Sequence, residues 1–146
     1  MVLIQFVIVV LRYVFDWNRI YIQESVVYLH AIVFLLGAAY TLKNEGHVRV
    51  DIFYREMTPK GKAMVNLLGT LLLLIPTFGF IFWEAWRYVM DSWSIMEASR
   101  EAGGIPGVYL LKTTILIMAG LMLLQGLAEV LRNMLVLTGH PQEHEA

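Results

Sequence analysis

Three stretches of the chain, residues 26–42, 63–83 and 110–128, are almost wholly apolar, and the only formal charge within them is on Lys112. An α-helix needs about 20 predominantly apolar residues to cross the roughly 30 Å hydrocarbon core of a bilayer. The composition agrees, because the chain is 58% hydrophobic and 16% charged, whereas soluble domains average about 45–50% and about 25%. The sequence therefore predicts an all-α membrane protein.

A fourth apolar stretch, residues 1–15, is shorter than these three. As a helix it measures roughly 22 Å at about 1.5 Å per residue, which is less than the hydrocarbon core. It is either an interfacial or partial span, or part of a longer first helix, and we favour the second interpretation. We therefore expect a bundle of four transmembrane helices, the first one short or truncated in this numbering.

Two amphipathic segments lie between the predicted spans. Residues 50–57 fit both strand and helix spacing, and we predict an interfacial helix because an isolated strand beside a membrane leaves its edges unpaired. Residues 84–102 place large apolar side chains at helical spacing among charged ones, which predicts a second interfacial helix. Thr58 and Pro59 are typical of an N-cap followed by proline at the first helical position. Pro76 should kink the third span.

The orientation follows from the lysine and arginine residues near the spans. Their densest cluster is the loop between the second and third spans. We therefore expect this loop to be cytoplasmic. With four spans, both termini are then cytoplasmic, and residues 84–102 face the periplasm or the exterior.

The residue pattern of a catalytic or cofactor site is lacking. The chain has no cysteine, which excludes disulfides and thiolate ligands, and its histidines are not paired on two spans as a haem site requires. The net charge of −1 offers no basic surface to nucleic acid. No carboxylate or amine lies at mid-depth of a span, where a transport site places one, and His30 is interpreted as a packing residue. We expect neither enzymatic activity nor a cofactor in this chain.

Polar and small side chains line one face of each of two predicted spans. On the second span this face comprises Gln23, His30, Gly37 and Thr41. On the third span it comprises Asn66, Thr70, Thr77 and Glu84. Such faces pack helices together in lipid, so they serve either the bundle itself or docking onto a larger membrane partner.

The densest polar passage runs from Gly46 to Tyr54 and contains Gly46, His47, Arg49 and Asp51. As residues alone, they are interpreted either as a structural corner at the interface or as a contact with a partner loop. Together with Arg12–Phe15 upstream and Ser99–Pro106 before the last span, the passage resembles the small membrane subunit of TRAP transporters, the tripartite ATP-independent periplasmic carriers (DctQ-like family). The resemblance covers nearly the whole chain, although residues 1–15 are shorter than the family's first helix.

The resemblance implies a non-catalytic subunit of the bacterial inner membrane, with membrane lipids and two proteins as partners. A large membrane subunit carries the substrate and sodium sites, and a periplasmic binding protein delivers the substrate, typically an organic acid. The two polar faces are then candidates for the large-subunit interface. The candidate docking surface for the binding protein comprises Arg87, Asp91, Glu97, Arg100 and Glu101. The alternative function is a four-helix membrane anchor of a quinone or haem respiratory complex.

Overall fold

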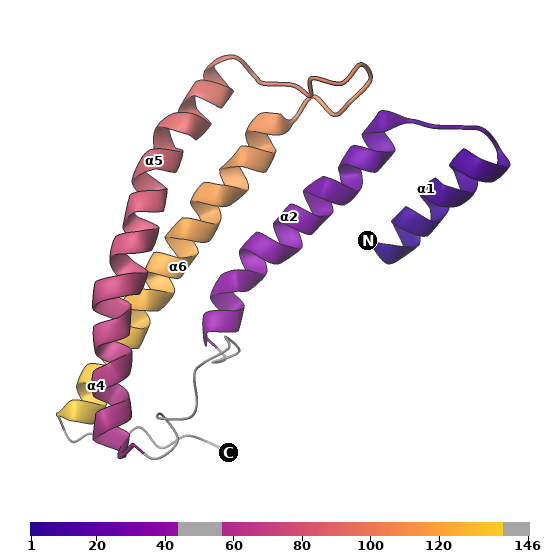
Figure 1. Ribbon diagram of the computed structural model, residues 1–146. Helices are drawn as coiled ribbons and strands as arrows, with labels where there is room; N and C mark the ends of the chain where they lie inside the picture. Colours follow the sequence, from indigo (N-terminus) through magenta and orange to yellow (C-terminus); the bar gives the residue numbers. More distant parts are fainter. Residues whose placement is uncertain (44–56, 139–146) are drawn as a thin grey trace. The chain divides into compact units, whose positions relative to one another are not determined.

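The computed structural model describes residues 1–43 and 57–138, and within these ranges the chain is helical and has no strand (Figure 1). The helical elements are α1 (Val2–Val14), α2 (Ile20–Lys43), α4 (Pro59–Gly69), the π-helical turn η1 (Thr70–Leu74), α5 (Ile75–Ser94) and α6 (Val108–Leu137). The predicted all-α membrane fold is confirmed. The predicted interfacial helix over residues 50–57 lies outside the described residues, except for its last position.

Three helices are long and apolar enough to cross a membrane among the residues described: Ile20–Leu42, Pro59–Ser94 and Val108–Leu137. Helix α1 is apolar but has 13 residues, or about 20 Å. The helix through α4, η1 and α5 has 36 residues, which corresponds to roughly 54 Å. Since the hydrocarbon core is about 30 Å thick, this helix extends well beyond it.

Residues 84–102 differ from the prediction of a separate interfacial helix. Residues 84–94 continue α5, and residues 95–107 are not helical. The reason is that no helix-breaking residue stands between the third span and Ser94. The amphipathic pattern is therefore the exposed end of the same helix, and it does not mark a new element.

The start of α4 confirms the predicted cap. The Thr58 hydroxyl accepts a hydrogen bond from the Gly61 N–H at 3.3 Å, and Pro59 occupies the first helical position. Proline suits this position because its missing N–H would have no helical acceptor there.

The π-turn η1 changes the face that the third span presents. The Ile75 N–H donates to the Thr70 carbonyl five residues earlier. This bond lies immediately before Pro76, which has no N–H to donate. A π-turn adds about one residue to the helical repeat, so the residues after it are rotated by roughly 100°. Consequently the predicted polar face is divided: Thr70 is buried, whereas Thr77 and Glu84 are exposed.

The chain packs as two compact units. The first comprises residues 1–38 and 83–118, and there the end of α5 packs beside the beginning of α6 (Figure 1). Its buried residues on these two helices are Ala85, Val89, Ser92, Thr114 and Leu116.

The second unit comprises residues 39–82 and 119–146. Its close packing occurs where η1 meets α6. A Cβ placed on Gly126 would lie 3.7 Å from Thr70 Cγ2, 3.6 Å from Ile75 Cγ1 and 2.6 Å from Leu74 Cδ2. A side chain at position 126 would therefore force the Leu74 side chain to move, and glycine avoids this, as small residues commonly do between helix pairs in lipid.

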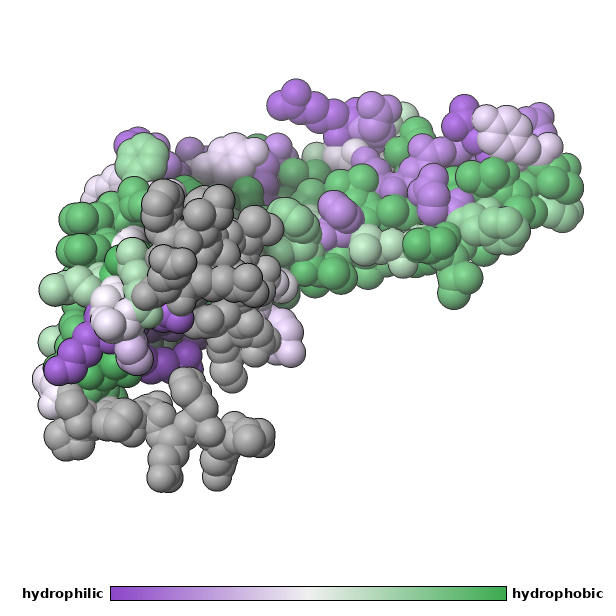
Figure 2. Space-filling view, turned by 60° about the horizontal axis from the view of Figure 1, so that its bottom comes forward, coloured by the Kyte–Doolittle hydropathy of each residue, from purple (hydrophilic) through white to green (hydrophobic). Residues whose placement is uncertain are grey.

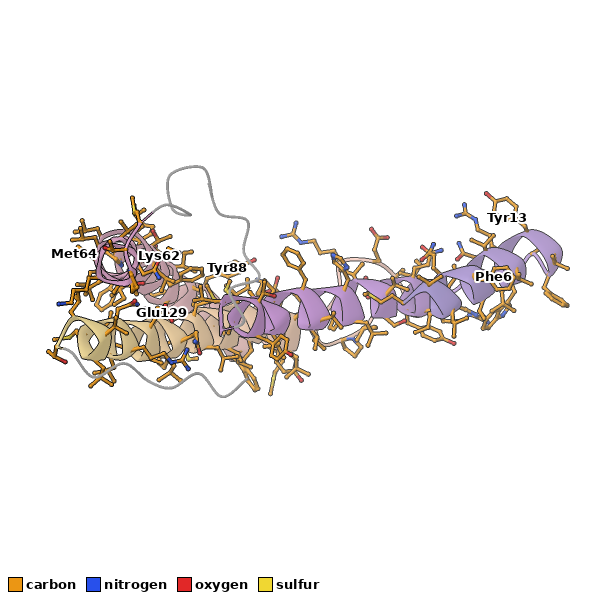
Figure 3. All side chains as sticks on the ribbon, turned by 90° about the horizontal axis from the view of Figure 1, so that it is seen from below. Phe6, Tyr13, Lys62, Met64, Tyr88 and Glu129 are labelled. Carbon is orange, nitrogen blue, oxygen red and sulfur yellow. The ribbon has the colours of Figure 1, made fainter. Side chains whose placement is uncertain are left out.

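Large apolar side chains cover much of the visible surface (Figure 2). Phe6 and Tyr13 project from α1 and are 65% and 78% exposed (Figure 3). Leu72, Leu73 and Phe80 are each about two-thirds exposed or more, at 69%, 70% and 67%. Soluble monomers rarely expose contiguous apolar areas of this kind, so these faces fit contact with lipid or with another membrane protein.

Candidate functional site

The 95–107 loop joins α5 to α6 and lies outside both helices. It begins at a Schellman motif, in which the Glu97 N–H donates to the Ser92 carbonyl at 3.0 Å and the Met96 N–H donates to the Trp93 carbonyl at 3.2 Å. Met96 occupies the left-handed position with φ 47°. Glycine is the usual residue there, and a side chain costs about 1–2 kcal/mol. The loop therefore begins with a strained, exposed methionine.

Glu97 anchors the first half of the loop to both helices. Its Oε2 pairs with Lys112 Nζ on α6 and accepts a hydrogen bond from the Ser92 hydroxyl at 2.6 Å. Lys112 Nζ also lies 4.0 Å from the centre of the Tyr88 ring, a cation–π distance. The hydrogen bond from Lys112, followed by that from Ser92, lowers the pKa of the Glu97 carboxyl below its ordinary value.

Trp93 adds a second connection between α5 and α6. Its Nε1–H donates to the Thr113 hydroxyl at 2.9 Å, and its ring meets Tyr109 edge-on with centroids 4.7 Å apart. The first contact satisfies the polar N–H of tryptophan, and the second packs its large apolar ring. They fix the helix ends from which the loop emerges.

Glu24, on α2, holds the second half of the loop. Its carboxylate accepts hydrogen bonds from the Ser99 hydroxyl and, at 2.6 Å, from the Ile105 N–H. The loop also closes on itself, since the Ser99 N–H donates to the Ile105 carbonyl at 3.3 Å. These bonds connect α2 to residues that are 75 and 81 positions further along the chain.

Gly104 lets Ser99 and Glu24 come close together, because these two residues occupy the space that a side chain at position 104 would need. A Cβ on Gly104 would contact the Ser99 hydroxyl oxygen and would lie 2.5 Å from Ser99 Cβ and 2.8 Å from Glu24 Oε1. Gly103 beside it has φ +82°, a conformation that favours glycine. The two glycines therefore serve different purposes, one steric and one conformational.

The structure places the predicted docking residues in two groups. Arg87 and Asp91 are exposed on α5, and Arg100 and Glu101 are exposed on the loop. Glu97 is half-buried, and its carboxylate is engaged within the chain. Sequence reasoning did not identify the anchoring role of Glu24. The signal for it was a carboxylate close to an apolar run, where a charge that leaves water needs partners.

The other candidate residues are more scattered. Gln23 donates to Asn18 Oδ1 at 2.6 Å, and His30 is exposed with its ring stacked on Phe34 at 5.9 Å. Gly37, Thr41 and Asn66 are half-buried. Gly46, His47, Arg49 and Asp51 lie outside the described residues. Where the structure describes the chain, no group of three or more histidines or carboxylates is placed to hold a metal ion.

Comparison with known proteins matches the chain to a transporter family. A family model described as tripartite ATP-independent periplasmic transporters, DctQ component, matches residues 1–135. No curated protein matches the chain, and no solved structure does.

Proposed function

The chain belongs to the DctQ family of tripartite ATP-independent periplasmic transporters, and from this premise we propose that it is a scaffold subunit that supports the large membrane subunit and presents the 95–107 loop to the binding protein. As a family member it is a membrane component of a transporter. This membership argues against the alternative of a respiratory anchor subunit.

The observation that carries the docking proposal is the anchored 95–107 loop. It joins two helices that are both longer than the hydrocarbon core is thick, and its two halves are tied to different helices by Glu97 and Glu24. The anchors leave Arg100 and Glu101 exposed between them. A rigid loop with exposed charges suits recognition of a soluble partner, because little conformational entropy is lost on binding.

The scaffold proposal rests on the polar side chains of two membrane-spanning helices, α2 and the third span. Thr77 is exposed and Asn66 half-buried on the third span, and Gln23 and His30 lie on α2. Polar side chains on otherwise apolar helices are typical of helix–helix interfaces in membranes, and we propose that these contact the large subunit. Thr70 is used in packing against α6 within the chain and is not part of the proposed interface.

In this proposal the transporter imports an organic acid coupled to a cation, with the sodium sites in the large subunit. This chain lies in the bacterial inner membrane, where α1 acts as a short fourth span in addition to the three long helices. Both termini are then in the cytoplasm. The 95–107 loop then faces the periplasm, where the binding protein acts.

Single-cysteine cross-linking tests the docking surface cleanly, because the chain has no cysteine of its own. A cysteine at Arg100 or Glu101, loaded with a photoactivatable maleimide in the assembled complex, should cross-link to the binding protein. A cysteine at Thr77, within the span, is the matched control and should cross-link to the large subunit. Labelling of the binding protein from Thr77 and not from the loop would refute the proposed surface.

A further inference from the structure

We infer that Glu24 is the positioning residue of the docking surface: it holds the backbone of residues 99–105 in the conformation that the binding protein recognises. This inference rests on the proposed function, since it assigns a role within that docking surface. Glu24 itself is half-buried and acts through the loop that it holds.

Both oxygens of the Glu24 carboxylate are hydrogen-bonded to the loop. Each oxygen accepts one hydrogen bond, Oε1 from the Ser99 hydroxyl and Oε2 from the Ile105 N–H. Hydrogen bonds to a charged acceptor are about twice as strong as neutral ones. A half-buried carboxylate without these donors would carry an uncompensated desolvation cost, so α2 and the loop stabilise each other.

Residues 100–104 lie between the two donors, Ser99 and Ile105, and carry the exposed charges. Arg100 and Glu101 follow Ser99 directly, and the Ser99 hydroxyl oxygen accepts a hydrogen bond from the Glu101 N–H at 3.2 Å. The Gly104 N–H then donates to the Glu101 carbonyl at 3.0 Å. The backbone of Arg100 and Glu101 is therefore held at both ends, by the Ser99 hydroxyl and the Ile105 N–H that bind Glu24.

The Glu24 contacts are separate from the Glu97 contacts. Glu97, with Lys112 and Ser92, fixes the start of the loop to α5 and α6. Glu24 reaches only the later part, from α2. Loss of the Glu24 carboxylate should consequently release residues 99–105 and leave the helix ends in place, which distinguishes a positioning role from a general requirement for folding.

The test uses Glu24→Gln and Ser99→Ala in the complete transporter membrane complex, reconstituted in lipid nanodiscs. The matched control is Asp16→Asn, which removes one negative charge from an exposed position between α1 and α2 and keeps a residue that tolerates the positive φ there. Two measurements are made on each variant. Hydrogen exchange of peptides covering residues 99–107 reports the anchor, and the affinity for the purified, fluorescently labelled binding protein reports docking.

We expect Glu24→Gln to accelerate exchange of the Ile105 amide by about ten- to hundredfold, because a neutral amide replaces a charged acceptor. Affinity for the binding protein should fall at least fivefold, with the large subunit still bound. Ser99→Ala should give a smaller effect of the same kind, and Asp16→Asn should give neither.

Unchanged exchange in Glu24→Gln would overturn the anchor itself. Faster exchange with unchanged affinity would overturn the positioning role. If the unmodified complex does not bind the binding protein through this loop, the proposed docking function fails and the positioning role with it, whereas the exchange result still stands as a statement about the loop.

Discussion

Replacing Gly104 with alanine is the sharpest steric perturbation that the structure offers. The new methyl group would lie 2.5 Å from Ser99 Cβ and 2.8 Å from Glu24 Oε1, and a Cβ atom essentially never comes this close to a non-bonded atom. Ser99 Cβ is attached to the backbone and cannot rotate away. The loop itself must therefore move, and the bonds from Ser99 and Ile105 to Glu24 are lost or lengthened.

The magnitude follows from those two hydrogen bonds. Each bond to a charged group contributes about 1.5–3 kcal/mol when nothing replaces it. Glu24 is half-buried, so water recovers part of this loss. We expect the closed loop to be destabilised by about 2–3 kcal/mol, which corresponds to a roughly 30- to 150-fold larger open population at about 1.4 kcal/mol per tenfold change.

Limited proteolysis and hydrogen exchange of the protein in nanodiscs measure this opening. Gly79→Ala is the matched control, since a Cβ there would have nothing within 4 Å, and it should leave the loop unchanged. Gly103→Ala should cost only the left-handed strain of about 1–2 kcal/mol. If Gly104→Ala opens the loop no more than Gly79→Ala does, the proposed close packing around Glu24 is incorrect.

Three further outcomes are expected. The lowered pKa of Glu97 means that its pairing with Lys112 stabilises the loop above the unfolded-state pKa near 4.5 and is lost as the pH falls through the lower folded value. Proteolysis of the loop should be constant from about pH 7 to about pH 5 and increase below about pH 4.5, and Glu97→Gln should make this increase smaller. Gly126→Val should lower the free energy of unfolding of the detergent-solubilised protein by about 1–3 kcal/mol through overpacking, and with it the unfolding temperature. An unchanged unfolding temperature would contradict the close approach of η1 and α6. Asn66→Leu combined with Thr77→Leu should reduce recovery of the large subunit on affinity purification, whereas full recovery would exclude this face as the interface.

Much of the fold could be predicted because hydrophobicity and helix caps are local properties. The runs through 26–42, 63–83 and 110–128 indicated three helices long enough to span a membrane, and Thr58 with Pro59 indicated where one of them begins. These signals depend only on neighbouring residues, so a single sequence contains them.

The end of α5 could not be predicted in the same way. Glycine or asparagine usually marks a helix C-terminus, and the first glycines after α5 are Gly103 and Gly104. The helix ends eight positions earlier than the predicted Ala102, at Ser94, with Met96 in the left-handed conformation. Methionine gives no such signal, because its side chain makes that conformation unfavourable.

The faces of the third span were mispredicted for a different reason. A constant rotation of about 100° per residue places Thr70 and Thr77 on one side. The π-turn breaks that constancy, so Thr70 packs inward and Thr77 remains exposed. The contact of Glu24 with Ser99 and Ile105 was also beyond local reasoning, because it depends on how α2 packs beside a loop more than 70 positions away.

Co-purification shows whether this chain is a scaffold subunit of a larger transporter. The tagged chain is extracted from the membrane of its host in a mild detergent, and the proteins recovered with it are identified and quantified by mass spectrometry. A large polytopic membrane protein should be recovered with the chain in about equal amount. Recovery of the chain alone, or with a haem-containing respiratory complex, would show that the chain is not such a scaffold subunit.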